Sequence, residues 1–217
     1  LSENDHWRLT PGGRYLLDSD DGTTCAFVLP ETLPQGVRII GTHNDSPALR
    51  LKPQPTLVRE GLSLLNIEVY GGPILSTWFD RPLAIAGRAY SRSDNWAQPQ
   101  AHLVVLPETV TIPSLAAHMK RGDDPINPQK ELLALWGDAD APSLETRLAD
   151  YLGIATNDLL ATELYLVSAE QASRIGYGGD LYTTSRIDNL ANAYAACCAL
   201  CDSKPQHDIA LFISYQH

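Results

Sequence analysis

The sequence predicts an α/β fold: a mixed sheet core flanked by helices and interrupted by an inserted unit of strands and helices. Three observations support this prediction. The first third of the chain reads as strands joined by turns, a central block mixes strand and helix patterns, and the end of the chain reads as a buried helix followed by a buried strand. We therefore expect residues 1–87 and 180–217 to form two parts of one domain, with residues 88–179 inserted between them as a second domain.

Short apolar runs in the first third predict the first strands. Residues 24–29 and 37–42 are apolar runs bounded by Gly, Asp and Pro, which favour turns. In residues 65–69, Leu, Ile and Val alternate with Asn and Glu, as in a strand with one buried face. The glycine pair at 71–72 is expected to end that strand.

The central block carries both kinds of pattern. Strand-like segments lie at residues 102–106, 109–112 and 163–168. Helix-like segments lie at residues 114–121, 130–136 and 143–151, and a polar loop lies at residues 122–128. The block is therefore expected to form a unit with strands and helices of its own.

The last segment predicts a helix and a strand that belong to the core. Residues 187–201 are apolar nearly all round, which indicates a buried helix packed on a sheet. Asp188 stands where the N-cap of this helix would be, and Lys204-Pro205 is expected to end it. The continuous apolar run at 209–215 is typical of a strand inside a parallel sheet. This order of elements favours functional groups at the carboxyl ends of the strands.

The charge of the chain argues against two classes of partner. Its 217 residues include 16 Lys and Arg against 26 Asp and Glu, which gives a formal net charge of −10. The longest basic cluster is Lys120-Arg121, which is too small to recognise a phosphate backbone or an anionic bilayer. We therefore expect neither nucleic acid nor a membrane among the partners.

The sequence also favours a cytoplasmic location. The uncharged stretch at 189–201 is shorter than the roughly 20 residues that a membrane-spanning helix needs, and residues 1–10 lack the regions of a secretory leader. Cys197, Cys198 and Cys201 lie in one predicted helix, which suits reduced, buried side chains better than a disulfide scaffold. The chain starts with Leu and stops directly after a strand-like run, so we expect that both ends are cut.

The motif GTHNDSP, residues 41–47, holds the sharpest candidate site. His43 and Asp45 are two residues apart, so in an extended backbone both side chains project to the same side. The carboxylate could then accept the proton of one imidazole nitrogen while the other nitrogen binds a metal. The alternative is a histidine and an Asx turn on a loop, which the spacing alone favours.

Asp188 and His118 are weaker candidates. A carboxylate at the head of a buried helix stays ionised and can bind or bridge divalent cations, but Asp is also a common structural N-cap. His118 lies in the predicted helix 114–121, where a lone histidine is more often structural than a ligand. The CxxC at Cys198 and Cys201 is a weak zinc or redox motif, because no second CxxC accompanies it.

Four motifs occur in the order and at the approximate spacing of one known family. They are GTHNDSPALRLKPQP (41–55), NIEVYGGPILSTWFDRPLAIAGR (66–88), TIPSLAAHM (111–119) and TTSRIDNLANAYAA (183–196). Through them the chain resembles the aspartyl aminopeptidase family of zinc metallopeptidases from about Trp7 to its last residue. The resemblance implies a zinc-exopeptidase-like sheet core and, in residues 88–179, an inserted mixed β/α domain that mediates dimerisation and oligomerisation.

The resemblance also implies roles for the candidate residues. His43 would ligate zinc, and Asp45 would take part in catalysis by bonding the other nitrogen of that ring. Asp188 would bridge two zinc ions in each active site. His118 would reach the active site of a neighbouring subunit, either as a metal ligand or as a substrate contact.

The implied function is that of a hydrolase. The family consists of metalloproteases that remove N-terminal Asp or Glu from peptides with water activated by two zinc ions, and its dimers build a homo-oligomeric dodecamer. Two alternatives remain open. One is a non-catalytic oligomerisation or binding module, and the other is a di-zinc aminopeptidase of neutral specificity.

The sequence departs from the family in places. Asn44 stands where Thr is common, Ser114 stands where relatives can carry His, and Ser185 stands where a Ser-Pro pair is usual. The family continues after its last matched strand with two glutamates, a general base and a zinc ligand, and later supplies an Asp and a His. His217 would stand directly before that pair. The sequence thus carries about half of the implied site, and we expect this chain alone to be inactive.

Overall fold

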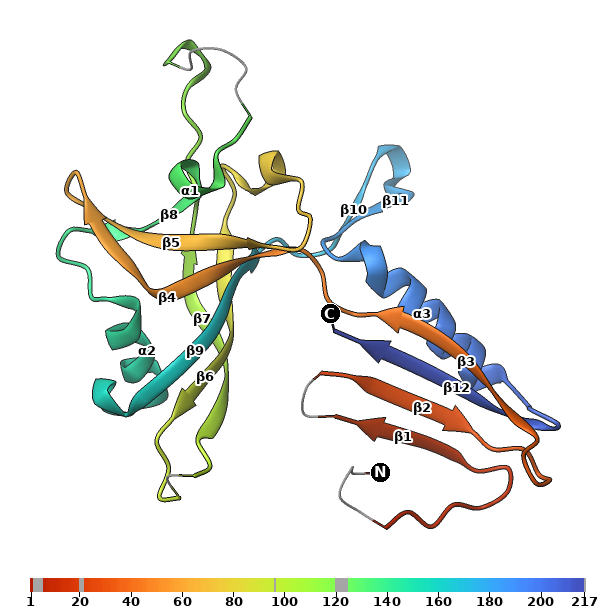
Figure 1. Cartoon of the computed structure of the whole chain (residues 1–217). Coiled ribbons are helices and arrows are strands. Elements are labelled where there is room, and N and C mark those ends of the chain that lie inside the picture. The colour runs from red at the N-terminus through yellow and green to blue at the C-terminus, as the bar shows by residue number, and fades with distance from the viewer. Residues whose placement is uncertain (2–5, 20–21, 96, 120–124, 217) are drawn as a thin grey trace. The chain divides into compact units, whose positions relative to one another are not determined.

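The computed structural model describes residues 1, 6–19, 22–95, 97–119 and 125–216. The chain forms two compact units: the split unit, from residues 1–46 and 186–217, and the inserted unit, from residues 47–185. Each unit combines a β-sheet with helices, so the mixed α/β fold class that the sequence predicts is confirmed (Figure 1).

The split unit is built on a four-stranded sheet. Its elements are β1 (Arg14–Asp18), β2 (Thr24–Val28), β3 (Gly36–His43), α3 (Ile187–Asp202) and β12 (Asp208–Tyr215). The strand order is β1-β2-β12-β3, with β12 antiparallel to β2 and parallel to β3. The ladder between β3 and β12 ends with Tyr215 opposite His43, so the carboxyl ends of the two strands meet at one edge of the sheet. His217 lies outside the described residues.

Helix α3 covers one face of this sheet. Ala196 and Leu200 of the helix pack with Val28 of β2 and Phe212 of β12. All four residues are less than 9% exposed, and together they form the buried cluster of the split unit. This packing places α3 against the sheet through its Ala196 and Leu200 side.

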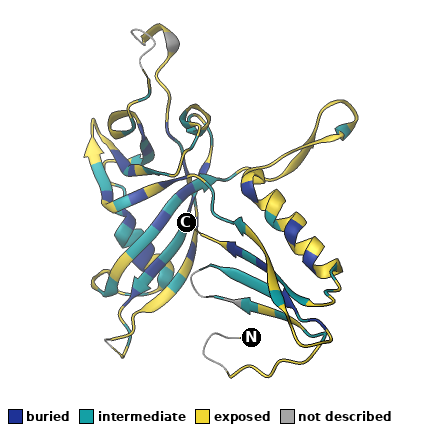
Figure 2. Cartoon of the chain, turned by 45° about the vertical axis from the view of Figure 1, so that its right-hand side comes forward, coloured by how far each residue is buried: buried dark blue, intermediate teal, exposed yellow. Residues whose placement is uncertain are grey.

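The expectation that residues 187–201 are buried all round is wrong for the outer side of α3. Figure 2 shows most of the helix as exposed, with a few buried residues spaced along it. Tyr194 is 74% exposed, and Cys197, Cys198 and Cys201 are exposed free thiols instead of buried ones. A single sheet can cover only one side of a helix, so the apolar residues around the rest of its circumference remain accessible.

The inserted unit is built on a six-stranded antiparallel sheet with the order β7-β6-β9-β4-β5-β8. Its strands are β4 (Ala48–Arg59), β5 (Leu62–Tyr70), β6 (Leu83–Ser91), β7 (Gln100–Val110), β8 (Leu133–Asp138) and β9 (Leu159–Ser168), followed by the hairpin β10 (Ser173–Ile175) and β11 (Leu181–Thr183). Its helices are α1 (Pro128–Glu131) and α2 (Leu144–Leu152), with single 3₁₀ turns η1 (Leu75–Trp78), η2 (Ala117–Met119), η3 (Thr156–Asp158) and η4 (Tyr177–Gly179).

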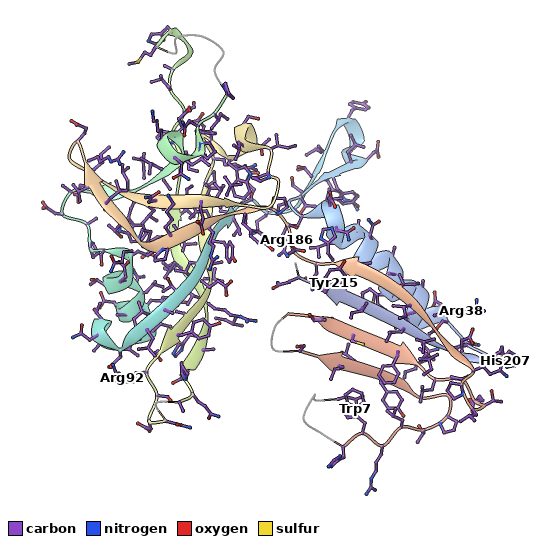
Figure 3. All side chains as sticks on the ribbon, in the orientation of Figure 1. Trp7, Arg38, Arg92, Arg186, His207 and Tyr215 are labelled. Atoms are coloured by element: carbon purple, nitrogen blue, oxygen red, sulfur yellow. The ribbon has the colours of Figure 1, made fainter. Side chains whose placement is uncertain are left out.

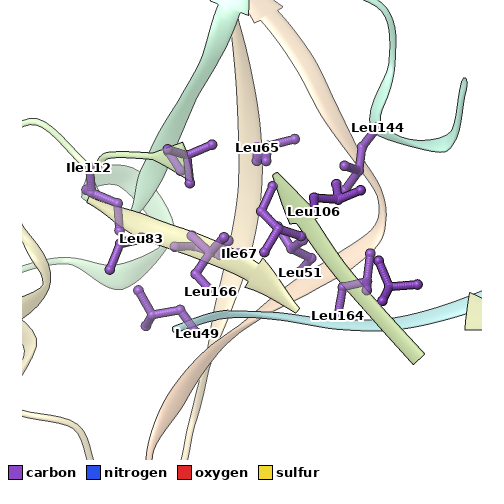
Figure 4. Close-up of a cluster of buried hydrophobic side chains, with 14 of the residues drawn as sticks. Leu49, Leu51, Leu65, Ile67, Leu83, Leu106, Ile112, Leu144, Leu164 and Leu166 are labelled. Atoms are coloured by element: carbon purple, nitrogen blue, oxygen red, sulfur yellow. The ribbon is translucent and has the colours of Figure 1, made fainter. Parts of the chain in front are cut away.

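Leucine and isoleucine side chains from nearly every strand form the core of the inserted unit (Figure 4). Leu49, Leu65, Leu83, Ile85 and Leu166 are 0% exposed. Burial of each such side chain contributes about 1.5–3 kcal/mol of transfer free energy. The core therefore gives the inserted unit a large hydrophobic stabilisation of its own.

One glycine is required where β6 pairs with β9. Gly87 has a φ of 152°, and a Cβ at this position would lie 2.1 Å from the carbonyl oxygen of Glu163. Only a residue without a side chain allows the two backbones to approach this closely.

Helix α2 follows the sequence prediction for residues 143–151. The hydroxyl of Ser143 accepts a hydrogen bond from the backbone N–H of Thr146 at 3.2 Å, as an N-cap does. Gly153 ends the helix in the left-handed conformation, with its N–H bonded to the last turn. Local capping signals therefore locate this helix without help from the tertiary structure.

The structure divides the chain elsewhere than expected. The expected boundary between residues 87 and 88 falls inside β6, which pairs with β7 on one side and β9 on the other. Strands β4 and β5 belong to the same sheet, so the inserted unit begins at Pro47, and it ends at Ser185. The correction follows from strand pairing, which joins segments far apart in the sequence.

Two other expected elements also differ. The predicted helix at 130–136 is one turn, α1, followed by strand β8, because residues 133–138 pair with β5. The predicted helix at 114–121 is the short turn η2 in its described part, and Lys120 and Arg121 lie outside the described residues. Among the described helices, none has the length and apolar character needed to cross a membrane.

Candidate metal centre

The candidate site lies where β3 and β12 end and α3 begins. The backbone N–H of Asn44 donates to the carbonyl of Tyr215 at 2.9 Å, which extends the contact between β3 and β12 past the last residue of β3. Figure 3 labels Tyr215 at the end of β12 and Arg186 at the head of α3. Both belong to the split unit, so this edge of the sheet can be described as one local structure.

His43 and Asp45 form a hydrogen-bonded pair at this edge. The Nδ1 atom of His43 lies 3.1 Å from Oδ1 of Asp45 and 3.2 Å from its backbone carbonyl oxygen. The His43 side chain is 35% exposed and that of Asp45 is 16% exposed. Two acceptors at Nδ1 favour a proton on that nitrogen, which leaves Nε2 as the nitrogen with a lone pair for a metal.

The expectation that Asp188 is the N-cap of α3 is wrong. Arg186 occupies the N-cap position in a left-handed conformation, with φ 65°, and no side chain caps the helix. Asp188 has φ −84° and ψ 113°, so its backbone is extended; the peptide bond that follows it is cis. The exposed carboxylate of Asp188 therefore makes no capping bond, and no other described residue bonds it.

Three hydrogen bonds join the loop after β3 to the head of α3. The Asn189 side-chain N–H donates to the carbonyl of His43 at 3.2 Å, and the Arg186 guanidinium donates to the carbonyl of Asn44 at 3.0 Å. In the opposite direction, the Ser46 hydroxyl donates to the carbonyl of Asp188 at 3.3 Å. These bonds bring the backbones of His43 and Asp188 together at one edge of the sheet.

None of the three residues that make these bonds is predicted as a site residue from the sequence. Asn189, Arg186 and Ser46 each flank a candidate residue within a motif, but none carries a chemistry that marks a metal site. Their partners lie more than a hundred residues away in the sequence. Only the three-dimensional structure could have identified them.

His118 lies in the inserted unit, on the segment that follows β7. Its side chain is exposed in the short turn η2. The start of this segment is anchored by Asp80, whose carboxylate accepts hydrogen bonds from the hydroxyl and from the backbone N–H of Ser114. These two bonds lower the pKa of Asp80 below its ordinary value, so Asp80 is ionised and able to accept both bonds at neutral pH.

The donor chemistry at the sheet edge suits a zinc ion, but the described ligand set is incomplete. Imidazole nitrogen and carboxylate oxygen are ordinary zinc ligands, and a catalytic zinc usually takes three from the protein. Within the described residues, no three His, Cys, Asp or Glu side chains come together as a metal site. His43 and Asp188 can therefore hold only part of a metal centre.

The structure thus shows an oriented His–Asp pair at the carboxyl edge of a mixed sheet, near an unbonded carboxylate, on an α/β core. The chain belongs to the aminopeptidase I zinc metalloprotease (M18) family, whose family model matches residues 1–217. The family expected from the four sequence motifs is thereby confirmed.

Curated relatives come from several pseudomonads. The chain is 38% identical over 229 residues to the probable M18 family aminopeptidase 2 of Pseudomonas savastanoi pv. phaseolicola, covering 100% of this chain and 53% of the relative. It is 40% identical over 212 residues to the protein of the same name from Pseudomonas entomophila, covering 92% and 49%. The chain thus spans about half the length of the curated relatives that it matches.

Solved structures share the fold. Chaetomium thermophilum mApe1 matches with a TM-score of 0.87 at 26% identity, covering 100% of this chain and 55% of the other. The Saccharomyces cerevisiae mApe1 dodecamer matches with a TM-score of 0.75 at 22% identity, covering 100% and 52%. An M18 family aminopeptidase from Thermotoga maritima matches with a TM-score of 0.76 at 22% identity, covering 92% and 47%.

Proposed function

We propose that the complete protein is a zinc aminopeptidase that removes N-terminal Asp or Glu from peptides. The observation that carries this proposal is the oriented His43–Asp45 pair, held against the Asp188 segment in a chain of the M18 family. His43 and Asp188 would hold zinc, with Asp188 shared between two ions. Bound zinc would supply a Lewis acid that polarises the scissile carbonyl and lowers the pKa of water towards neutrality.

The residues of this chain have separate tasks in the proposed site. Asp45 holds the proton of His43 on Nδ1 and fixes the plane of its ring, which keeps Nε2 in the lone-pair form. Asp188 contributes negative charge from an extended backbone at the head of α3. The general base and the remaining ligands would come from the part of the family's length that these residues do not span.

The proposal predicts a defined substrate preference. With zinc present, the complete protein is expected to cleave Asp- and Glu-anilides at least about tenfold faster, in kcat/KM, than Leu-anilide, because a pocket built to pair with a carboxylate penalises a substrate that lacks it. Faster cleavage of Leu-anilide would contradict acidic specificity and support the alternative of an aminopeptidase with neutral specificity. No cleavage of any of the three, with zinc bound, would leave the non-catalytic alternative.

We also propose that the protein works as a homo-oligomer, as dimers that build a dodecamer. Support comes from the S. cerevisiae mApe1 dodecamer, whose chain shares the fold. In such an assembly, His118 would reach the site of a neighbouring copy as a metal ligand or a substrate contact. Its exposure, on a segment anchored by the Asp80–Ser114 bonds, is compatible with a contact of this kind.

His118→Ala tests this role. The variant is expected to lower kcat/KM for a Glu-anilide by roughly 10- to 100-fold, the usual effect of a residue that supports a metal site, while the thermal midpoint stays unchanged because the side chain is exposed. Met119→Ala, which alters the next exposed side chain of η2, is the matched control and should keep full activity. Equal kinetics for the two variants would exclude His118 from the site.

A further inference from the structure

We propose that the three hydrogen bonds between residues 43–46 and 186–189 form a clamp that sets the position of His43 relative to Asp188. Asn189, Arg186 and Ser46 are then positioning residues for metal binding. The inference rests on the proposed function, because it assigns these residues to the same metal centre. It adds a property that the ligands themselves do not have, which is a fixed separation between them.

The bonds of the clamp end on the candidate ligands or directly beside them. Asn189 donates to the carbonyl of His43 itself, and Ser46 donates to the carbonyl of Asp188 itself. Arg186 donates to the carbonyl of Asn44, the residue between His43 and Asp45. Residues 186–189 thus donate to residues 43–46, and residues 43–46 donate back. A shift of one segment along the other would break bonds in both directions.

Asn189 is the best-fixed member of the clamp. It is only 7% exposed, and its amide is held from two sides: the nitrogen donates to His43, while the oxygen accepts from the side chain of Asn192 one turn along α3. Removal of either bond would leave a buried polar group without its partner, which is unfavourable. The orientation of Asn189 thus ties the backbone of His43 to the body of the helix.

The local backbone gives the head of α3 little support of its own. Asp188 is extended and Arg186 is left-handed, so the residues around Asp188 do not form a regular first helical turn. The whole inserted unit separates them from His43 in the sequence. A misplacement of about 1 Å can cost a site about 100-fold, so bonds across the edge are needed to hold the two candidate ligands in register.

The test separates positioning from ordinary stabilisation. Zinc affinity of the protein is measured by competition with a chelator, and stability by thermal unfolding, for Asn189→Ala, Arg186→Ala and Arg186→Lys. We expect Asn189→Ala and Arg186→Ala to weaken zinc binding by roughly 10- to 100-fold. We expect Arg186→Lys to restore most of the affinity, because an ammonium can donate to the same carbonyl. Removing the positive charge of Arg186 would by itself strengthen the binding of a zinc cation. A loss of zinc affinity in Arg186→Ala would therefore report on the geometry of the site.

The split unit offers matched controls. Arg14 donates its guanidinium to the carbonyls of Cys201 and Ser203, and Thr32 donates its hydroxyl to the carbonyl of Gln206. These bonds join distant segments as the clamp does, but at the other end of α3. Arg14→Ala and Thr32→Ala should lower stability by amounts similar to those of the clamp variants and leave zinc affinity unchanged.

The outcomes distinguish this inference from the proposed function. If His43→Ala abolishes zinc binding while the Asn189 and Arg186 variants bind zinc as the controls do, the clamp has no positioning role and the metal site stands. If His43→Ala also binds zinc normally, the proposed metal centre itself is wrong. Should Asn189→Ala fail to fold, the comparison of Arg186→Ala with Arg14→Ala decides, because both side chains are exposed.

Discussion

Replacing His43 with alanine is expected to remove bound zinc and aminopeptidase activity together from the complete protein. Residues that only orient a metal ligand are worth about 10- to 100-fold in metal affinity, so loss of the ligand itself should cost at least about 100-fold. Asp188, the other candidate ligand in the split unit, already has its own place in the proposed site, so it would leave the position of the imidazole empty. Metal analysis of the purified variant and its rate on a Glu-anilide provide the two measurements.

His207→Ala is the matched control for this prediction. His207 is an exposed imidazole of the same unit, in the connection between α3 and β12, at the other end of the sheet. Figure 3 labels it there, together with Arg38. The variant should retain its metal content and its activity. A His43→Ala protein with normal zinc content would contradict the ligand assignment, whatever its activity.

Leu166→Ala is expected to destabilise the inserted unit by about 2–5 kcal/mol. Leu166 is 0% exposed in β9, where it lies opposite Leu49 of β4 and Ile85 of β6. Truncation of its side chain leaves a cavity that the paired strands on both sides cannot close, because the ladders fix their spacing. Urea unfolding followed by circular dichroism measures the change.

Leu160→Ala on the same strand provides the comparison. Leu160 is 49% exposed, so the same chemical change at this position should cost no more than about 0.5 kcal/mol. Equal losses for the two variants would mean that the cost of the substitution does not come from the burial of Leu166 in the core. A large effect confined to Leu166 would confirm that the central strands carry the stability of the inserted unit.

The sequence predicts those elements whose signals are local. Helix α2 has its N-cap at Ser143 and its terminating glycine at Gly153, and the apolar runs of β3 and β12 form strands close to their expected bounds. Strand β8 was missed because residues 130–136 have a helical pattern, and only pairing with β5 makes them extended. The domain boundary could not be predicted for the same reason: it depends on strand pairing. Strand β6 belongs to the inserted unit because it pairs with β7 and β9.

The candidate site also has a part that the local sequence predicts and a part that only the tertiary structure determines. The spacing of His43 and Asp45 is enough to place both side chains on one side of the chain, and the hydrogen bond between them is present in the structure. Nothing local could predict the bonds of Asn189 and Arg186, because their acceptors lie in a segment at the far end of the sequence. For Asp188, the helix-cap rule predicts the wrong position, because Arg186 takes the N-cap position and Asp188 is extended inside the first turn of α3.

The parallel pairing of β3 with β12 has a consequence for biosynthesis. Because the whole inserted unit separates β3 from β12 in the sequence, β3 leaves the ribosome well before its parallel neighbour is made. The inserted unit, which has a sheet and a core of its own, can fold during that interval and bring its two ends together through the pairing of β4 with β9. The sheet edge that carries His43 can therefore form only after the inserted unit has been translated.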